Sequence, residues 1–315
     1  MTKVACVFPG QGSQQVGMGK DLLEKSAESK EKFLLADKRL GFPLTDLIMN
    51  GPEEKLTLTE NTQPAILTVS CLLYDLLRKK GIRPDYVAGH SLGEYSALYA
   101  AGVFSFEDAV YGVRQRGLHM EKAVPAGEGT MAAVLGLEAD VLDELCHKVS
   151  AEGNPVQLAN LNAPGQIVIS GSIQGVSKAS TLASESGARR VVPLSVSGPF
   201  HSSLMIPAAE AMRQTLDTLS IHHAEIPVIA NRTAIEETQV DEIRTHLIEQ
   251  LYSPVRWIES IERLKANGVD TYIEVGPGKV LSGLIKKIHR GARILSVYDI
   301  ASLDSVSEQL KECAE

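Results

Sequence analysis

The sequence predicts an α/β protein built on a parallel sheet, and three observations support this fold class. Residues 4–8 are a short apolar run ended by Pro9 and Gly10, as expected of a strand buried on both faces. Residues 85–89 form a second such run. An amphipathic helical stretch separates the two runs, and a helix-compatible stretch begins directly after the second, at Ser91. Strands that alternate with helices in this way are typical of a parallel sheet.

The helical stretches have recognisable start and stop signals. From Gln63 to Lys79 apolar residues recur at helical spacing, Pro64 fits the first turn, and Gly81 ends the helix. Ser105 resembles a helix N-cap that is followed three residues later by an acidic residue. We therefore expect a second helix from there towards Ala123.

Residues 128–197 follow a different pattern from the chain on either side. Their predicted order of strand, helix, strand, strand, helix, strand is the ferredoxin-like split pattern. We expect a ferredoxin-like small subdomain at 128–197, inserted into a discontinuous core of residues 1–127 and 198–315 whose two parts rejoin one sheet. The predicted strands of the insert are residues 130–137, 156–161, 166–170 and 190–196, its helices are 138–150 and 173–186, and later core strands are 227–230, 271–275 and 293–297.

Composition and charge exclude several functional classes. The 315 residues carry a formal net charge of −8, so no global positive field exists to hold nucleic acid. Neither a secretion signal nor a run of about 18 apolar residues is present, so we expect a cytoplasmic protein without a membrane segment. The cysteines form no CxxC pair, which argues against a metal site or a disulfide framework. They are Cys6, Cys71, Cys146 and Cys313.

The segment from Gly89 to Gly93 carries the main chemical signal. It is a Gly-x-Ser-x-Gly motif placed after a predicted strand and before a predicted helix, which is the context of a nucleophile elbow. Glycines two residues before and after Ser91 relieve crowding at the turn. The start of the following helix favours a developing oxyanion. The alternative is a glycine-lined tight turn without chemistry.

A serine nucleophile needs a base, because its hydroxyl is weakly nucleophilic at neutral pH. His201 lies in a turn-rich stretch after the insert and is the candidate, although a surface-loop histidine is the alternative. His90 adjoins Ser91, but successive side chains point apart. Arg116, near the end of its helix, either faces solvent or points into the site, where its planar fork would pair with a substrate carboxylate.

The loop from Pro9 to Gln14 follows the first predicted strand, where ligand-facing loops of α/β sheets collect. It is either a flexible turn or the source of a second oxyanion donor, the backbone N–H of Gln11. It is not a phosphate-binding P-loop, since no Gly-Lys-Ser/Thr follows.

Several further motifs occur in one order along nearly the whole chain, which is far more specific than Gly-x-Ser-x-Gly alone. They are residues 9–14, 63–65, 89–95, Arg116-Gly117 with Met120, 162–166, Phe200-His201, 250–254 and 274–278. Together they resemble the malonyl-CoA:acyl carrier protein transacylases of fatty acid synthesis. This family places a ferredoxin-like insert on an α/β-hydrolase-like core, in agreement with the fold predicted above.

The resemblance implies roles for the residues of the turn and its partners. Ser91 would be the nucleophile, and His201 would be its general base. The main-chain carbonyl of Gln250 would orient His201 in place of a carboxylate. The backbone N–H groups of Gln11 and Leu92 would form the oxyanion hole.

The resemblance also implies a substrate and a reaction. Arg116 would bind the malonyl carboxylate, and Met120 and Phe200 would complete the substrate site. Malonyl would pass from malonyl-CoA to acyl carrier protein through a malonyl-serine ester, without a cofactor. Phe200 resembles the bulky residue of malonyl-using members, but the choice between malonyl and methylmalonyl stays open, as does a fatty acid or polyketide pathway.

Acyl carrier proteins are acidic, so a protein of negative net charge needs a local basic patch to attract one. The candidates are Lys286, Lys287 and Arg290 with Arg293, or else Arg189 and Arg190, although solvated helix faces also carry such runs. We expect a monomer. Two rival functions remain at this point, a serine esterase or thioesterase that uses the same turn and a non-catalytic docking scaffold.

Overall fold

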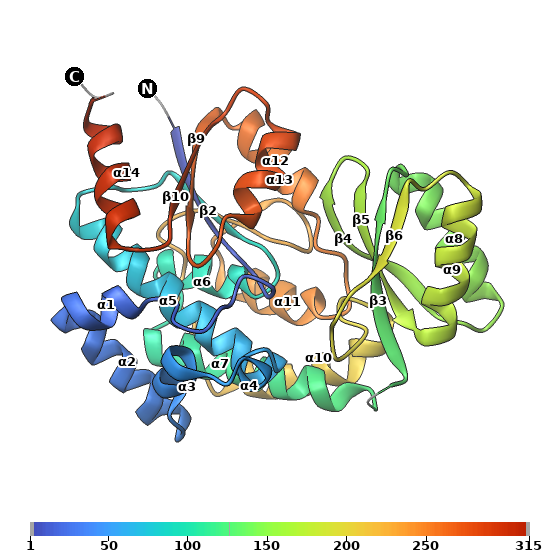
Figure 1. Ribbon diagram of the computed structural model, residues 1–315, viewed down its shortest axis with the longest axis horizontal. Helices are drawn as coiled ribbons and strands as arrows, with labels where there is room; N and C mark the ends of the chain where they lie inside the picture. Colours follow the sequence, from blue (N-terminus) through green and yellow to red (C-terminus); the bar gives the residue numbers. More distant parts are fainter. Residues whose placement is uncertain (1–2, 126, 313–315) are drawn as a thin grey trace.

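The computed structural model describes residues 3–125 and 127–312, and its chain forms two lobes with one sheet each (Figure 1). In the larger lobe the strand order is β10-β9-β1-β2-β7-β8. All neighbours in it are parallel except the antiparallel pair β7 and β8. The predicted α/β class with a parallel sheet is confirmed. The strands are β1 (Lys3–Phe8), β2 (Tyr86–Gly89), β7 (Val228–Ile229), β8 (Glu236–Glu237), β9 (Val269–Val275) and β10 (Arg293–Val297).

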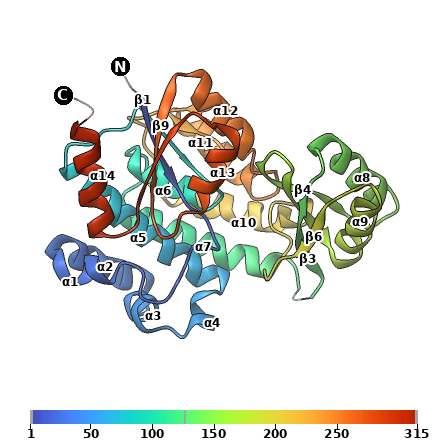
Figure 2. The ribbon, with the colours of Figure 1, turned by 45° about the horizontal axis from the view of Figure 1, so that its top comes forward.

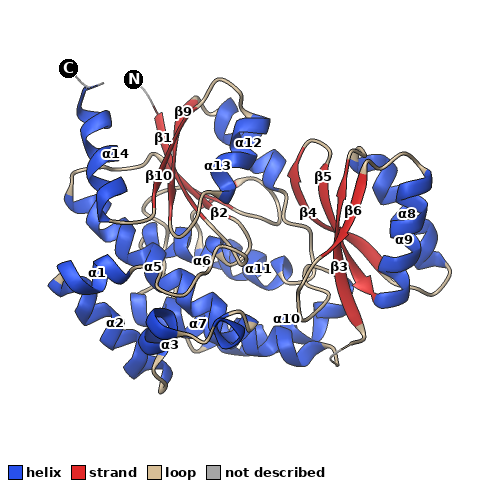
Figure 3. Cartoon of the chain, in the orientation of Figure 1, coloured by secondary structure: helices blue, strands red, loops and turns tan. Residues whose placement is uncertain are grey.

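Helices cover both faces of this sheet, as Figure 3 shows. Successive side chains of β1 alternate between the faces, so Cys6 and Phe8 belong to one apolar core and Ala5 and Val7 to another. The first core includes α5, α6 and α7, and the second includes α12 and α13. The helices of this lobe are α1 (Lys20–Lys25), α2 (Ala27–Leu40), α3 (Leu44–Asn50), α4 (Glu53–Leu56), α5 (Thr59–Lys79), α6 (Gly93–Ala100), α7 (Phe106–Ala123), η1 (Ser203–Met205), α10 (Ile206–Asp217), α11 (Val240–Gln250), α12 (Trp257–Ala266), α13 (Val280–Ile288) and α14 (Ile300–Glu312).

The prediction that Pro64 lies in the first turn of its helix is wrong, because α5 begins at Thr59 and Pro64 lies inside it. A proline at this position cannot donate to the carbonyl four residues earlier, that of Glu60. Arg114 supplies the missing donor, with Nη1 2.6 Å from the Glu60 oxygen. A contact between α7 and α5 therefore compensates for a residue that would otherwise end the helix.

The smaller lobe is the segment predicted as an insert, and its element order is strand, helix, strand, strand, helix, strand, as predicted. Its antiparallel sheet has the order β4-β5-β3-β6. Helices α8 and α9 lie on its outer side, away from the larger lobe, in both views of the ribbon (Figures 1 and 2). The exact boundaries at 127/128 and 197/198 stay predictions. The elements are β3 (Gly129–Leu135), α8 (Ala139–Ala151), β4 (Val156–Ala163), β5 (Gln166–Ser172), α9 (Ile173–Glu185) and β6 (Arg190–Pro193).

Main-chain contacts join the smaller lobe to the larger one. The Leu161 N–H of β4 donates to the Val255 carbonyl over 2.9 Å, and the Val255 N–H donates to the Ala159 carbonyl over 2.8 Å. Met131 and Val168 extend the main apolar core of the larger lobe into the smaller sheet. The two lobes therefore share a packed boundary, at which the functional residues lie.

Three of the cysteines, Cys6, Cys71 and Cys146, are buried free thiols, and Cys313 lies outside the described residues. Among residues 3–125 and 127–312 no cluster of His, Cys, Asp or Glu has the arrangement of a metal site. No helix in the same ranges has the length and apolar character needed to cross a bilayer.

Candidate active site

The turn between β2 and α6 holds Ser91 in a conformation that few side chains adopt. Its φ is 52°, in the left-handed region. The turn is possible because a Cβ at Gly89 would overlap the main chain of Gly93, and a Cβ at Gly93 would overlap the Phe8 carbonyl of β1. The two glycines of the motif are therefore steric requirements, and the hydroxyl projects at the carboxyl end of the sheet.

Ser91 and His201 are in hydrogen-bond contact, although they are 110 residues apart in sequence. Ser91 Oγ lies 2.8 Å from His201 Nε2, and His201 Nδ1 lies 2.8 Å from the main-chain oxygen of Gln250. Since a carbonyl only accepts, Nδ1 carries the proton and Nε2 is free to take one from the serine. Gln157 of β4 also holds this loop, because its Nε2 donates to the His201 carbonyl over 3.3 Å.

The surroundings of His201 favour its neutral form. Its side chain is buried, and burial together with the cation of Arg116 lowers the pKa of His201 from 6.5 to about 3. Hydrogen bonding to Gln250 works in the opposite direction and is weaker. His201 is therefore an unprotonated base across the neutral range.

Arg116 is almost fully buried and points into the site, so the solvent-facing alternative is excluded. Its Nη1 donates to Gln63 Oε1 over 2.9 Å, and its Nη2 donates to Gln250 Oε1 over 2.8 Å and to Ser91 Oγ over 3.1 Å. All three acceptors are neutral, and no ion pair of Arg116 is formed within the described residues. Burial lowers the pKa of Arg116, as expected of a cation removed from water without a counterion.

The nearest carboxyl group is a poor counterion. Glu94 in α6 is fully buried, and burial together with the nearby Glu237 raises the pKa of Glu94 to about 8. Its carboxyl is therefore mostly protonated at neutral pH. The Gln250 amide separates it from Arg116, donating to Glu94 Oε2 over 2.6 Å while accepting from Arg116. The positive charge of Arg116 stays available for an incoming anion.

Asn231, which follows β7, is a site residue that the sequence alone did not reveal. Its Oδ1 accepts from the Ser91 N–H over 2.7 Å, and its Nδ2 donates to the Gly89 carbonyl over 2.6 Å. Its own N–H donates to Glu94 Oε2 over 3.2 Å. Asn231 therefore satisfies the main chain on both sides of the turn. No local pattern marks it, whereas Glu94 and Gln63 do lie within motifs of the chain.

The positions predicted as oxyanion donors have free amides. A Cβ at Gly10 would overlap the His90 carbonyl, so the loop after β1 lies directly against the Ser91 turn. The backbone N–H groups of Gln11 and Leu92 donate to no acceptor in the described part of the chain. Free N–H groups beside a serine hydroxyl suit stabilisation of negative charge.

A pocket of about 290 Å³ surrounds the Ser91 hydroxyl, and both lobes line it. Gln11, Leu92 and Arg116 line it from the larger lobe, and Met131 and Asn160 from the smaller. The predicted substrate-binding residues Met120 and Phe200 form part of its wall. Both are buried, and Met120 Sδ also accepts from Gln63 Nε2 over 3.4 Å.

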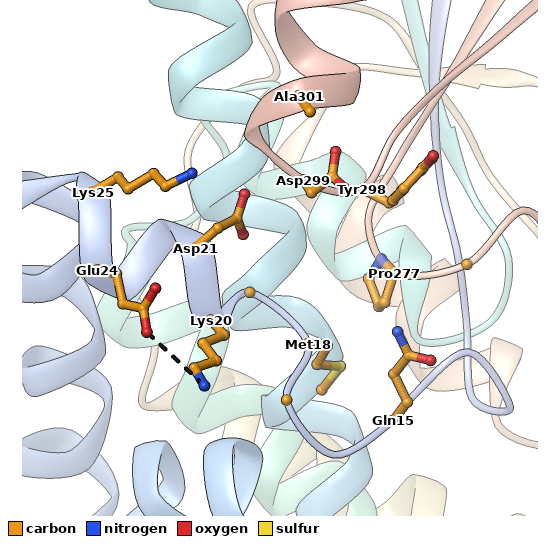
Figure 4. A pocket seen from close by; sticks show the side chains of 13 residues that line it. Gln15, Met18, Lys20, Asp21, Glu24, Lys25, Pro277, Tyr298, Asp299 and Ala301 are labelled. Atoms are coloured by element: carbon orange, nitrogen blue, oxygen red, sulfur yellow. Dashed lines mark ion pairs between the residues drawn. The ribbon is translucent and has the colours of Figure 1, made fainter.

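A second hollow, of about 520 Å³, lies between α1 and the segment after β10 (Figure 4). Its wall includes the exposed ion pair Lys20–Glu24 together with Asp21, Tyr298 and Asp299. Neither a serine, a cysteine nor a histidine is among its lining residues. The hydrogen-bonded pair of Ser91 and His201 lies in the smaller pocket, so we take that pocket as the candidate active site.

Comparison with known proteins identifies the class. Residues 5–307 match the family model of the acyl transferase domain. The malonyl CoA-acyl carrier protein transacylase of Bacillus subtilis (strain 168) is 55% identical over 312 residues, which are 99% of this chain and 98% of that protein. The protein is an acyltransferase.

Solved structures agree with this class. The malonyl CoA-acyl carrier protein transacylase of Coxiella burnetii superposes with a TM-score of 0.95 at 39% identity, covering 98% of each chain. A malonyl-transacylase in complex with its type II PKS acyl-carrier protein superposes with a TM-score of 0.95 at 41% identity, covering 98% of this chain and 100% of that one. The chain belongs to the malonyl CoA-acyl carrier protein transacylase family.

The low pKa of His201 predicts an unusual pH profile. A base with a pKa of about 3 stays neutral as the pH falls through 6.5, so kcat/KM for Ser91 acylation should stay level from about pH 7.5 to about pH 5.5. A histidine of ordinary pKa would lose roughly tenfold by the lower value. Malonyl-pantetheine is the donor to use, because it has no phosphate that titrates in this range. A half-maximal point near pH 6.5 would contradict the assignment.

The contacts of Asn231 predict a loss of both stability and rate when they are removed. Asn231→Ala leaves the Ser91 N–H and the Gly89 carbonyl unpaired, and the free energy of unfolding should fall by about 2–4 kcal/mol. Ser91 acylation should also slow, because the turn is no longer held. Ser260→Ala is the control, since it removes the hydrogen bond that a buried serine of α12 donates to the carbonyl of Arg256, the residue before that helix. Ser260→Ala should lower the free energy of unfolding and leave the rate of Ser91 acylation unchanged. Equal acylation rates for Asn231→Ala and Ser260→Ala would exclude a positioning role for Asn231.

Proposed function

We propose that the protein transfers malonyl from malonyl-CoA to the phosphopantetheine thiol of acyl carrier protein. The product, malonyl-acyl carrier protein, would supply fatty acid synthesis. One observation carries the proposal: a serine–histidine pair shares its pocket with a buried arginine that forms no ion pair within residues 3–125 and 127–312. A pocket with an unpaired cation beside the nucleophile favours an acyl group that has its own carboxylate. The names of the relatives give the same acyl group and the same acceptor.

In the first half-reaction Ser91 Oγ attacks the thioester carbonyl carbon, and His201 Nε2 takes the hydroxyl proton. The new bond is Oγ–C, and negative charge develops on the carbonyl oxygen beside the N–H groups of Gln11 and Leu92. The C–S bond then breaks, and His201 returns the proton to the coenzyme A thiolate. The product is a malonyl ester of Ser91.

The second half-reaction repeats these steps with another thiol. The phosphopantetheine thiol of the carrier protein gives its proton to His201 and attacks the ester carbon. The C–O bond to Ser91 breaks, and His201 returns the proton to Ser91 Oγ. All groups in this scheme come from the chain and its two substrates, so no cofactor is required.

Arg116 separates this function from that of a serine esterase for neutral acyl groups. The guanidinium group of Arg116 would pair with the malonyl carboxylate. Met120 and Phe200 would limit the space around the acyl chain. Phe200 would restrict a branch next to the carbonyl, which favours malonyl over methylmalonyl. A fatty acid rather than a polyketide pathway, a monomeric state and a cytoplasmic location stay predictions.

The carrier protein would dock at the end of α13. Lys286, Lys287 and Arg290 are exposed there, and Lys287 Nζ donates to Gln166 Oε1 of the smaller lobe over 2.8 Å. This basic group lies where the two lobes meet, as the active-site pocket does. Arg189 and Arg190 are exposed too, but they lie at the start of β6 within the smaller lobe. We therefore favour the α13 group.

Intact-mass measurement tests the proposed transfer. After mixing with malonyl-CoA the protein should gain one malonyl group, and Ser91→Ala should gain none. Arg116→Ala should slow malonylation by roughly a hundredfold, the order expected for loss of a buried charge-assisted pair. Lys122→Ala is the matched control, because Lys122 lies exposed on the same helix and is not part of the pocket lining. A non-catalytic scaffold would gain no mass. In an esterase for neutral acyl groups, Arg116→Ala would leave the acylation rate nearly unchanged.

Charge reversal tests the docking surface. The double variant Lys286→Glu with Lys287→Glu should raise KM for acyl carrier protein roughly tenfold at low salt and leave malonylation by malonyl-CoA unchanged. Lys30→Glu with Lys38→Glu makes the same charge change on exposed residues of α2 and should have little effect. Equal KM values for the two double variants would rule out the α13 group.

A further inference from the structure

Arg116 contacts the nucleophile itself in the substrate-free protein. Of its five N–H donors, one reaches Gln63, one reaches Gln250 and one reaches Ser91 Oγ, 3.1 Å from Nη2. Its Nε has no acceptor within the described residues. The guanidinium is therefore held by two glutamines and uses a third donor on the serine oxygen.

This contact changes the state of the serine oxygen. The hydroxyl proton is directed to His201 Nε2, and one of the two lone pairs of Oγ accepts from Arg116. A hydrogen bond from a cation draws electron density from the oxygen and fixes its direction. Oγ is thus a weaker nucleophile while Arg116 holds it, even though its base is in place.

We propose that Arg116 restrains the Ser91 hydroxyl in the free enzyme and that the carboxylate of an acidic acyl group releases it. The idea rests on the proposed function and deepens it. The malonyl carboxylate is separated from the thioester carbonyl by one methylene, so an acyl group that reaches Oγ brings its carboxylate to the Nη2 donor. A carboxylate is a stronger acceptor for guanidinium than a hydroxyl is, and it replaces Oγ there.

Through this release the enzyme would select its acyl group by the reactivity of Ser91 as well as by binding affinity. A neutral acyl thioester leaves the bond from Arg116 to Oγ intact and meets a restrained nucleophile. Malonyl-CoA removes that bond as it binds, and the proton transfer to His201 and attack then follow as in the proposed reaction. If Arg116 only anchored the carboxylate, acylation by a neutral donor would not depend on whether the arginine is occupied by another anion.

A substrate supplied in two pieces tests the inference. Acetyl-CoA provides the thioester, and formate provides a carboxylate for Arg116. The rate of Ser91 acetylation is measured by intact mass in single-turnover mixtures as sodium formate replaces sodium chloride at constant ionic strength. Formate should accelerate acetylation of the unmodified enzyme roughly tenfold, the order expected for release of one hydrogen bond to a charged group.

Two variants complete the experiment. Arg116→Ala should be acetylated faster than the unmodified enzyme without formate and should not respond to formate. Lys122→Ala should respond as the unmodified enzyme does, because Lys122 lies exposed on the same helix. A flat or falling rate with formate in the unmodified enzyme overturns the proposal, whatever the fate of Arg116→Ala. Malonylation of the same enzyme sample by malonyl-CoA distinguishes the proposed function from the proposed restraint. If the enzyme is not malonylated, the proposed function is wrong. If it is malonylated but formate does not accelerate acetylation, only the proposed restraint by Arg116 is wrong.

Discussion

The close approach of three main-chain segments is the constraint on which the rest of the structure depends. The end of β1, the turn at Ser91 and the loop from Pro9 to Gln14 pack so closely that side chains at Gly10, Gly89 and Gly93 would overlap neighbouring backbone. This packing forces Ser91 into the left-handed region, and the amides of Gln11 and Leu92 beside its hydroxyl have no acceptor among the residues that the structure describes. The proposed nucleophile and the proposed oxyanion donors thus come from one steric requirement, and hydrogen bonds with Asn231 and Gln250 hold the strained turn.

Gln250 ties the three functional groups to one another. Its carbonyl holds the imidazole of His201, its side-chain oxygen holds Arg116, and its side-chain nitrogen donates to the Ser91 carbonyl over 3.0 Å. Because one residue at the end of α11 contacts all three, base, nucleophile and cation cannot move independently. A histidine oriented by a carbonyl also stays neutral more readily than one paired with a carboxylate, which would stabilise the imidazolium. This agrees with the low pKa of His201.

The sequence allowed the strands, the elbow and the element order of the smaller lobe to be predicted, because each depends on local apolar periodicity and on glycine placement. The start of α5 was missed, since Pro64 lies inside that helix, and the donor to the carbonyl that it leaves unpaired is Arg114, 50 residues later. The short strand β8 lacks a long apolar run and was missed as well. Asn231 could not be found from local patterns, because its partners in the turn lie about 140 residues earlier. Long-range polar contacts of this kind leave no periodic signal.

Selection by an unpaired buried charge differs from selection by size. Removing Arg116 from water without a counterion costs free energy in the empty enzyme, and the neutral acceptors Gln63 and Gln250 offset only part of that cost. In the proposed function an acidic acyl group would recover the rest on binding, whereas a neutral one of similar volume would leave the cation as it was. The apolar walls at Met120 and Phe200 discriminate by no more than a few kcal/mol per methylene, roughly. In the proposed function the charge would therefore decide which class of acyl group reacts, and the walls would refine the choice within that class.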